Sequence, residues 1–388
     1  MENNKEKEVS SSPIERALSF SELRRVEPKQ REVLYPPVVI AHITKDITDL
    51  FVPRIADKTE IQMHYSAQMN SHPHLGTVLS LMTAFALGEK LSTRFGIPTK
   101  LKFEVLENAP GERIEVNGRV YTKMLCDTLK DGVPLSDIYL ESFKDLLSML
   151  SKQTGIKVEY LTYKQFQELP FVRQTLITIL NREEEFKPII APSEDHLRVR
   201  FPCPKCRFEE KGGETTTIKK IDNSHLFLES ECFQHGKHQI LLAPENKDFV
   251  DINTPLRNVI KEALFIEEAR VKNGLDVMVD GGDWVSMVEF VVSEGLARLG
   301  YSYKDRPVRV FTPIIEDWSG AKLSKSVYVE KGKYEYLPDG FLNFVRFKEQ
   351  FGEEGIEKLW NEVCSWVEEP KKLLRNYTAE YFLQLLRI

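Results

Sequence analysis

The sequence predicts an α/β protein built on a parallel sheet. Residues 58–65 alternate between apolar and polar side chains, as a strand does, with Ile61 and Met63 on one face. From Leu75 the apolar residues recur at helical spacing, and Gly96 and Pro98 stop that helix. Residues 100–106 then alternate again. A strand, helix and strand in this order form a unit whose strands pair in parallel, with helices on the sheet faces.

The same pattern returns late in the chain. Residues 275–279 form a short apolar strand, residues 285–299 a helix, and residues 308–315 another strand. Between the two regions, residues 114–120 are typical of a hairpin with Asn117-Gly118 at its turn. Residues 135–190 are mostly helical in pattern. We therefore expect two halves of one sheet separated by an insertion.

Five segments follow from these patterns. They are an N-terminal tail and helical lead-in (1–57), the first half of a nucleotide-binding fold (58–134), an insertion (135–250) that contains a cysteine-bearing module (198–242), the second half of the fold (251–330), and a helical C-terminal segment (331–388).

Composition and charge narrow the class of protein. The 388 residues are 41% hydrophobic and 29% charged, as is ordinary for a globular chain, and there is no apolar run of about 18 residues that could span a membrane. Residues 1–12 lack the apolar stretch of a secretory signal. The net charge of −6 weighs against a large RNA footprint. Five cysteines, an odd number, favour a reducing, cytoplasmic setting and a metal site over disulfides.

The first chemical candidate is the segment 71–77, SHPHLGT, between a predicted strand and a predicted helix. The first turn of a helix offers unpaired N–H groups and a positive dipole end, which suit phosphate. Gly76 would allow close approach of a nucleotide, and His74 could donate a hydrogen bond to a phosphoryl oxygen. The plainer interpretation is a proline-marked turn with two surface histidines, His72 and His74, and by itself the segment slightly favours it.

Two further segments are candidates. Residues 319–326, SGAKLSKS, form a Gly/Ser-flanked loop after a predicted strand, and Lys322 and Lys325 could place ammonium groups on a polyphosphate. Residues 281–284, GGDW, close a strand and open a helix. The alternatives are a solvated basic loop and a Gly-Gly turn with Asp283 as helix cap.

Taken together, these segments resemble the signatures of class I aminoacyl-tRNA synthetases. Residues 74–77, HLGT, resemble their HIGH motif, except that Thr77 stands where His or Asn is common. Residues 322–326, KLSKS, resemble KMSKS in four of five positions, and roughly 250 residues separate the two. The segment 281–284 is similar to the family's adenosine-binding strand end.

The resemblance implies a doubly wound, Rossmann-like sheet and a defined chemistry. ATP and Mg²⁺ would bind at the switch point of the sheet, and an amino-acid carboxylate would attack the α-phosphorus to give an aminoacyl-adenylate. The residues implied as catalytic are His74, Lys322 and Lys325. Those implied to contact ATP are His74, Gly76, Thr77, Gly281, Gly282, Asp283, Lys322, Ser324 and Lys325.

A metal site is predicted by the cysteines of the insertion. Cys203 and Cys206 are three positions apart, and 25 residues later Cys232 and His235 repeat that spacing. Two such knuckles match a tetrahedral Zn²⁺ ribbon, and four protein ligands would make it structural rather than catalytic. His238 is the alternative fourth ligand, but His235 mirrors the first knuckle. The plainer alternative is free cysteines scattered in an insertion.

With this inserted ribbon, the chain most resembles class I lysyl-tRNA synthetases between about residues 58 and 326. Those enzymes carry a further anticodon-binding portion, for which the roughly 60 remaining residues are too few. The resemblance therefore implies activation of an amino acid, with lysine suggested, and transfer to tRNA or to another acceptor. The alternative from a different class is a non-catalytic sensor or RNA-binding regulator that keeps the fold. The oligomeric state stays open.

Overall fold

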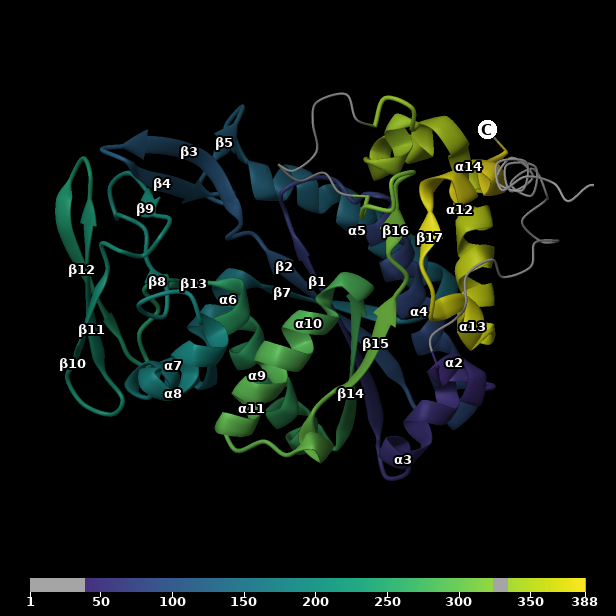
Figure 1. The fold of residues 1–388 in the computed structure, drawn as a ribbon, viewed down its shortest axis with the longest axis horizontal. Helices are drawn as coiled ribbons and strands as arrows, with labels where there is room; N and C mark the ends of the chain where they lie inside the picture. Colours follow the sequence, from purple (N-terminus) through teal and green to yellow (C-terminus); the bar gives the residue numbers. More distant parts are fainter. Residues whose placement is uncertain (1–38, 324–333, 388) are drawn as a thin grey trace, which may run out of the picture.

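The centre of the molecule is a five-stranded sheet in which every neighbouring pair is parallel. The structure, a computed structural model, describes residues 39–323 and 334–387 (Figure 1). The strand order is β15-β14-β1-β2-β7. The strands are β1 (Glu60–Gln68), β2 (Thr99–Leu106), β7 (Lys157–Thr162), β14 (Gly274–Gly281) and β15 (Val308–Thr312). The predicted α/β fold with a parallel sheet is confirmed.

The predicted strand–helix–strand unit is β1, α4 (Leu75–Phe95) and β2. Gly96 ends α4 with a φ of 67°, a left-handed conformation that glycine adopts without strain. Strand β1 continues to Gln68, three residues beyond its predicted end, because Ser66, Ala67 and Gln68 pair with β2 rather than forming a turn.

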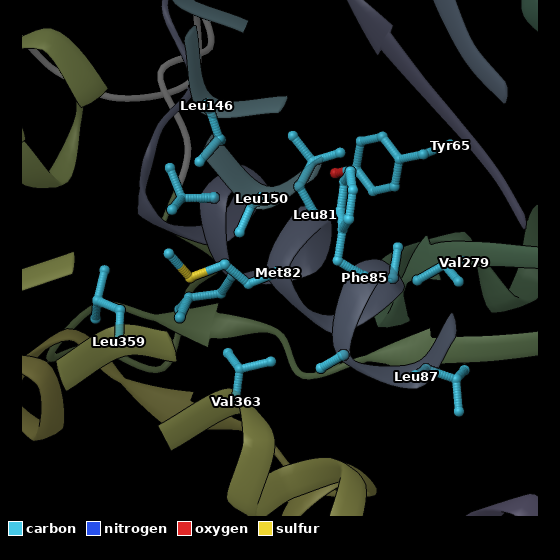
Figure 2. Close-up of a cluster of buried hydrophobic side chains, with 14 of the residues drawn as sticks. Tyr65, Leu81, Met82, Phe85, Leu87, Leu146, Leu150, Val279, Leu359 and Val363 are labelled. Atoms are coloured by element: carbon cyan, nitrogen blue, oxygen red, sulfur yellow. The ribbon is translucent and has the colours of Figure 1, made fainter. Parts of the chain in front are cut away.

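Helix α4 fills one face of the sheet. Figure 2 shows Leu81, Met82 and Phe85 of α4 between Tyr65 and Val279 of the strands and side chains from two further helices. Those helices are α5 (Leu135–Thr154) and α12 (Phe344–Glu368), represented by Leu146, Leu150, Leu359 and Val363. Helix α9 (Thr254–Lys272) covers the opposite face, where Phe265 stacks on His64 of β1 at a ring distance of 3.8 Å.

The insertion differs from its prediction at β7. Residues 135–190 do contain α5, α6 (Tyr163–Glu168), α7 (Pro170–Asn181) and α8 (Glu183–Ile190). Strand β7 lies among them and pairs with β2 along six residues. It therefore belongs to the central sheet. The prediction of a mostly helical segment is confirmed by the four helices, but it did not include this strand.

The cysteine-bearing module and the hairpin lie at one end of the molecule, and the C-terminal helices lie at the other (Figure 1). The hairpin of β3 (Pro110–Val116) and β4 (Arg119–Met124) turns at Asn117 and Gly118, whose φ angles of 51° and 77° suit the predicted tight turn. Strand β9 (Glu209–Glu210) of the module pairs with β4. The remaining strands of this region are β5 (Leu129–Lys130), β6 (Val133–Pro134), β8 (Val199–Arg200), β10 (Thr217–Lys220), β11 (Leu226–Cys232), β12 (Gly236–Leu242) and β13 (Asp251–Ile252).

The second half of the sheet ends differently from its prediction. Strand β15 stops at Thr312, because Pro313 cannot donate to the ladder, and a short β16 (Ile315–Glu316) pairs instead with β17 (Tyr377–Thr378). The predicted helix after β14 is confirmed as a continuous helical run to Arg298, which opens with a 3-10 turn and contains a π-helical stretch. Its parts are η3 (Gly282–Trp284), α10 (Val285–Met287), η4 (Val288–Val292) and α11 (Ser293–Arg298).

The chain's two ends are helical where they are described. The lead-in consists of α2 (Ile40–Ile43), η2 (Ile47–Phe51) and α3 (Val52–Ile55). Beyond η5 (Tyr303–Asp305) and η6 (Asp339–Phe341), the C-terminal segment is α12, α13 (Pro370–Leu373) and α14 (Ala379–Leu386), as predicted. Across residues 39–323 and 334–387, none of the helices combines the length and the apolar character that crossing a membrane requires.

We expect Phe85→Ala to lower the free energy of unfolding by about 3–5 kcal/mol, because it opens a cavity in the fully buried interface of α4 with the sheet. Urea unfolding followed by tryptophan fluorescence measures this. Phe290→Ala is the matched control, because that ring is 74% exposed. Equal losses in the two variants would contradict the assigned core.

Candidate functional site

A cleft opens at the carboxyl ends of β1 and β14, where the chain leaves the sheet in two directions. From β1 it passes through α4 to β2, whereas β14 is followed by β15 on the other side. In open parallel sheets this switch point is where ligands bind. The cleft has a volume of about 250 Å³. Its walls come from the end of β1, the start of α4, the ends of β14 and β15, and the segment at Lys322 and Leu323.

The histidine corner forms one wall. His74 is the residue before the first turn of α4, and its carbonyl accepts from Val78 N–H at 2.9 Å. Gly76 lies under the His74 imidazole, since a Cβ at Gly76 would stand only 3.1 Å from His74 Cε1. Thr77 also lines the cleft. The corner therefore presents an imidazole and the positive end of a 21-residue helix to the same space.

The strand end at 281–284 forms the facing wall. Gly281, Asp283 and Trp284 line the cleft. A Cβ on Gly281 would come within 2.6 Å of Asp283 Oδ1, so a side chain at this position would displace the Asp283 carboxylate. Gly282 is placed differently from its neighbours. It borders a separate apolar pocket with Ile40 and Val285, and a Cβ there would stand 3.2 Å from the Thr312 carbonyl oxygen.

Lys322 reaches across to this wall. Its Nζ lies 2.5 Å from Asp283 Oδ2, and both side chains are partly exposed. The two predicted segments are thus joined by an ion pair across the cleft. Ser324 and Lys325, the other predicted residues of the lysine loop, lie outside the described residues.

A turn that sequence reasoning missed holds Lys322 in place. Buried Asp317 accepts from the backbone N–H groups of Ser319 and Ala321, at 2.9 and 3.2 Å, and Leu323 N–H donates to the Ile315 carbonyl at 2.7 Å. Gly320 adopts a φ of 81° in the same turn. An aspartate two residues before a serine is a local turn signal that could have identified it.

Hydroxyl groups line the floor of the cleft. The Ser80 and Thr312 hydroxyl oxygens lie 2.7 Å apart, linking α4 to the end of β15. Burial raises the pKa of Tyr65 well above its ordinary value, so this phenol stays protonated at neutral pH. The floor is therefore uncharged, and the described charged side chains of the lining are Asp283 and Lys322.

A second candidate site lies in the cysteine-bearing module. One ligand atom from each of Cys203, Cys206, Cys232 and His235 falls within 4.8 Å of the others. Cys206 Sγ lies 3.5 Å from Cys232 Sγ, and His235 Nδ1 lies 3.6 and 3.7 Å from the sulfurs of Cys203 and Cys232. A disulfide would need about 2.05 Å, whereas tetrahedral zinc bonds of about 2.3 Å place ligand atoms roughly 3.5–3.8 Å apart. The four predicted residues therefore form a group that could hold a metal ion.

His238 is not part of this group. Its ring packs against Phe201 at a centroid distance of 5.0 Å. Cys126 and Cys364 are also separate from the cluster, and burial raises the pKa of Cys364 to about 11 and that of Cys126 to about 12. Both isolated thiols are thus protonated at neutral pH.

Comparisons with known proteins add little to this geometry. No protein-family model matches the chain, and no curated protein matches it either. Among solved structures, the chain is similar to a candidate arginyl-tRNA synthetase from Campylobacter jejuni, with 9% identity, a TM-score of 0.34, and coverage of 81% of this chain and 67% of that one. A likeness of this size establishes neither a family nor an activity.

Proposed function

We propose that this protein binds ATP with Mg²⁺ and activates an amino acid as its adenylate, in the manner of class I synthetases. The observation that supports this is the convergence of three separate segments on one cleft at the sheet's switch point: the histidine corner, the GGDW strand end and the start of the lysine loop. Each segment is individually weak evidence. Their meeting at the place where parallel sheets bind nucleotides is what favours the enzyme.

In the proposed complex the triphosphate lies between His74 and Lys322. His74 and the N-terminus of α4 would bind phosphoryl oxygens, and Lys322 with Lys325 would stabilise the β- and γ-phosphates. Asp283 would accept from ribose hydroxyls, and Gly281 would let the nucleoside approach the backbone. The aspartate and the lysine now pair with each other at 2.5 Å, so ATP would separate them by offering each a better partner.

The chemical step needs no covalent nucleophile from the protein. A carboxylate oxygen of the amino acid forms a bond to the α-phosphorus as the bond from that phosphorus to the bridging oxygen breaks, and pyrophosphate carries away the electron pair. The protein positions the reactants and stabilises the charge that develops on the phosphates. Lysine as the amino acid, and tRNA or another molecule as the acyl acceptor, stay predictions from the resemblance alone.

We also propose that Cys203, Cys206, Cys232 and His235 bind a structural Zn²⁺ ion. The support is the spacing of the four ligand atoms and the burial of Cys203 and Cys232. Four protein ligands leave no open position for substrate. The ion would fasten the 203–206 knuckle to the turn between β11 and β12, a region with few buried apolar side chains of its own.

Lys322→Ala should lower amino-acid-dependent exchange of labelled pyrophosphate into ATP by roughly 100-fold or more, because it removes a cation that stabilises the transferred charge. We expect the same direction for Lys325→Ala. Lys348→Ala is the control, since that exposed lysine pairs with Asp145 on the surface. Exchange at the parent rate in both loop variants would contradict the assignment. Absence of exchange in the parent with every amino acid would favour the alternative, a non-catalytic sensor.

Purified protein should contain close to one zinc ion per chain, measured by inductively coupled plasma mass spectrometry. Cys232→Ser should lose most of it and lower the thermal midpoint, because metal binding stabilises the folded module. Cys364→Ser should keep its zinc, since that cysteine lies apart from the cluster. A parent protein without zinc would exclude the site.

A further inference from the structure

The sheet face that α9 covers carries a group of buried ionisable side chains. Along β1, Ile61, Met63 and Tyr65 belong to the apolar core around α4, and the alternate residues His64 and Ser66 contact groups on the other face. His64 Nε2 lies 2.8 Å from Asp276 of β14. One member of this group, Ser66, also lines the cleft. The buried group therefore reaches the proposed active site through a single hydroxyl.

Two side chains fix that hydroxyl, Lys261 and Glu104. Lys261 Nζ, on α9, lies 2.9 Å from Ser66 Oγ and 3.1 Å from Glu104 Oε2. Ser66 Oγ lies 2.5 Å from the same Glu104 oxygen. The side chains of Lys261 and Glu104 are 7% and 4% exposed. A buried ion pair loses its hydration and adds little to stability. We therefore looked for a role of the Lys261–Glu104 pair in the cleft beside it.

The protonation of the three groups follows from their chemistry. Burial works to raise the pKa of Glu104, but Lys261, His64 and the Ser66 hydrogen bond outweigh it and hold this pKa below its ordinary value. The carboxylate is thus ionised at neutral pH and can only accept. The Lys261 ammonium can only donate. Ser66 must therefore donate its one proton to Glu104 and accept from Lys261.

A serine hydroxyl has one proton and two lone pairs. With the proton and one lone pair already engaged, Ser66 retains one lone pair and can act toward a ligand only as an acceptor. It would bind an N–H donor and disfavour a phosphate or carboxylate oxygen. The charged donor of the described lining is Lys322, and the first turn of α4 offers backbone N–H groups on the same wall. Neutral donors, among them Gln68 and Asn70, also line the cleft. Ser66 is therefore an acceptor in a cleft whose anion-binding groups are Lys322 and the N-terminus of α4.

We propose that Ser66 binds the α-ammonium group of the substrate amino acid, and that Lys261 and Glu104 are positioning residues that make its hydroxyl an obligatory acceptor. This inference rests on the proposed function. It adds an orientation: the ammonium group lies at Ser66 and the carboxylate points toward the phosphates at His74 and Lys322. A contact between Ser66 and the α-ammonium group does not depend on which side chain the amino acid carries.

The test compares Ser66→Ala, Ser66→Thr and the parent, as full-length chains, in two assays. The first is thermal stabilisation by each standard L-amino acid in the presence of Mg²⁺ and a non-hydrolysable ATP analogue. The N-acetylated form of each amino acid, which lacks the ammonium, is the comparison ligand. The second is pyrophosphate exchange with the amino acid that binds best. Ser365→Ala is the matched control, because this serine lies on α12 and donates to the carbonyl of Glu362 at 2.7 Å.

We expect Ser66→Ala to raise the KM for the amino acid roughly tenfold or more, because a hydrogen bond to a charged group is lost. The KM for ATP should stay within about twofold, and Ser66→Thr should restore the parent values by restoring the hydroxyl. The preference for the free amino acid over its N-acetylated form should shrink in Ser66→Ala alone. Lys261→Met, checked for intact folding by circular dichroism, should raise the same KM without changing that for ATP.

The outcomes distinguish a failure of the Ser66 assignment from a failure of the proposed adenylation activity. If amino acids bind or exchange and Ser66→Ala matches the parent, the role of Ser66 is wrong, but the proposed adenylation activity is not affected. If Ser66→Ala weakens amino-acid binding but the parent shows no exchange, the role of Ser66 is supported and the proposed adenylation chemistry is wrong. If ATP stabilises the parent and no amino acid does so, both are overturned.

Discussion

The parallel pairing of β1 with β14 decides where this protein can bind a ligand. The two strands run side by side over five residue pairs. Beyond that ladder their chains separate, one into α4 and one toward β15, and the cleft lies between the ends of the two strands. The helix that starts there has unpaired N–H groups, and at the end of β14 a side chain at position 281 would displace the Asp283 carboxylate. The cleft is therefore a consequence of topology, and the polar side chains around it give it chemistry.

The two faces of the central sheet have opposite character. The face toward α4 is built of apolar side chains from all the inner strands, and Figure 2 shows how tightly α4 is enclosed. The face toward α9 holds His64, Lys102, Glu104 and Asp276, all of them buried. Lys102 is paired with Glu268, and Lys261 with Glu104. The apolar face supplies stability, while the ionised face fixes the Ser66 hydroxyl that reaches the cleft.

Local patterns predicted much of this arrangement. The turn at Asn117-Gly118, the end of α4 at Gly96 and the cysteine spacing each depend on a few neighbouring residues, and the structure confirms the turn, the helix end and the clustering of the four ligands. Strand β7 was missed because its six residues stand directly between the helical patterns of α5 and α6. The tertiary contact between Asp283 and Lys322, 39 positions apart, has no local signature.

The buried ionised face could not have been predicted for a different reason. In β2 the alternation of Lys100, Lys102 and Glu104 with apolar residues is typical of a strand whose polar side faces water. Alternation of polar and apolar residues shows only that the two faces of a strand differ in polarity. It carries no information on whether a helix later covers the polar face, and here α9 buries Lys102 and Glu104.

The central claim is that a nucleotide lies between the histidine corner and Lys322. A crystal structure of the full chain with Mg²⁺ and a non-hydrolysable ATP analogue tests it most directly. Our account predicts the triphosphate at the N-terminus of α4 within hydrogen-bonding distance of His74, the ribose at Asp283, and Lys322 moved from Asp283 to a phosphate. A nucleotide bound elsewhere, or a cleft in which Lys322 still pairs with Asp283 beside a bound nucleotide, would contradict it.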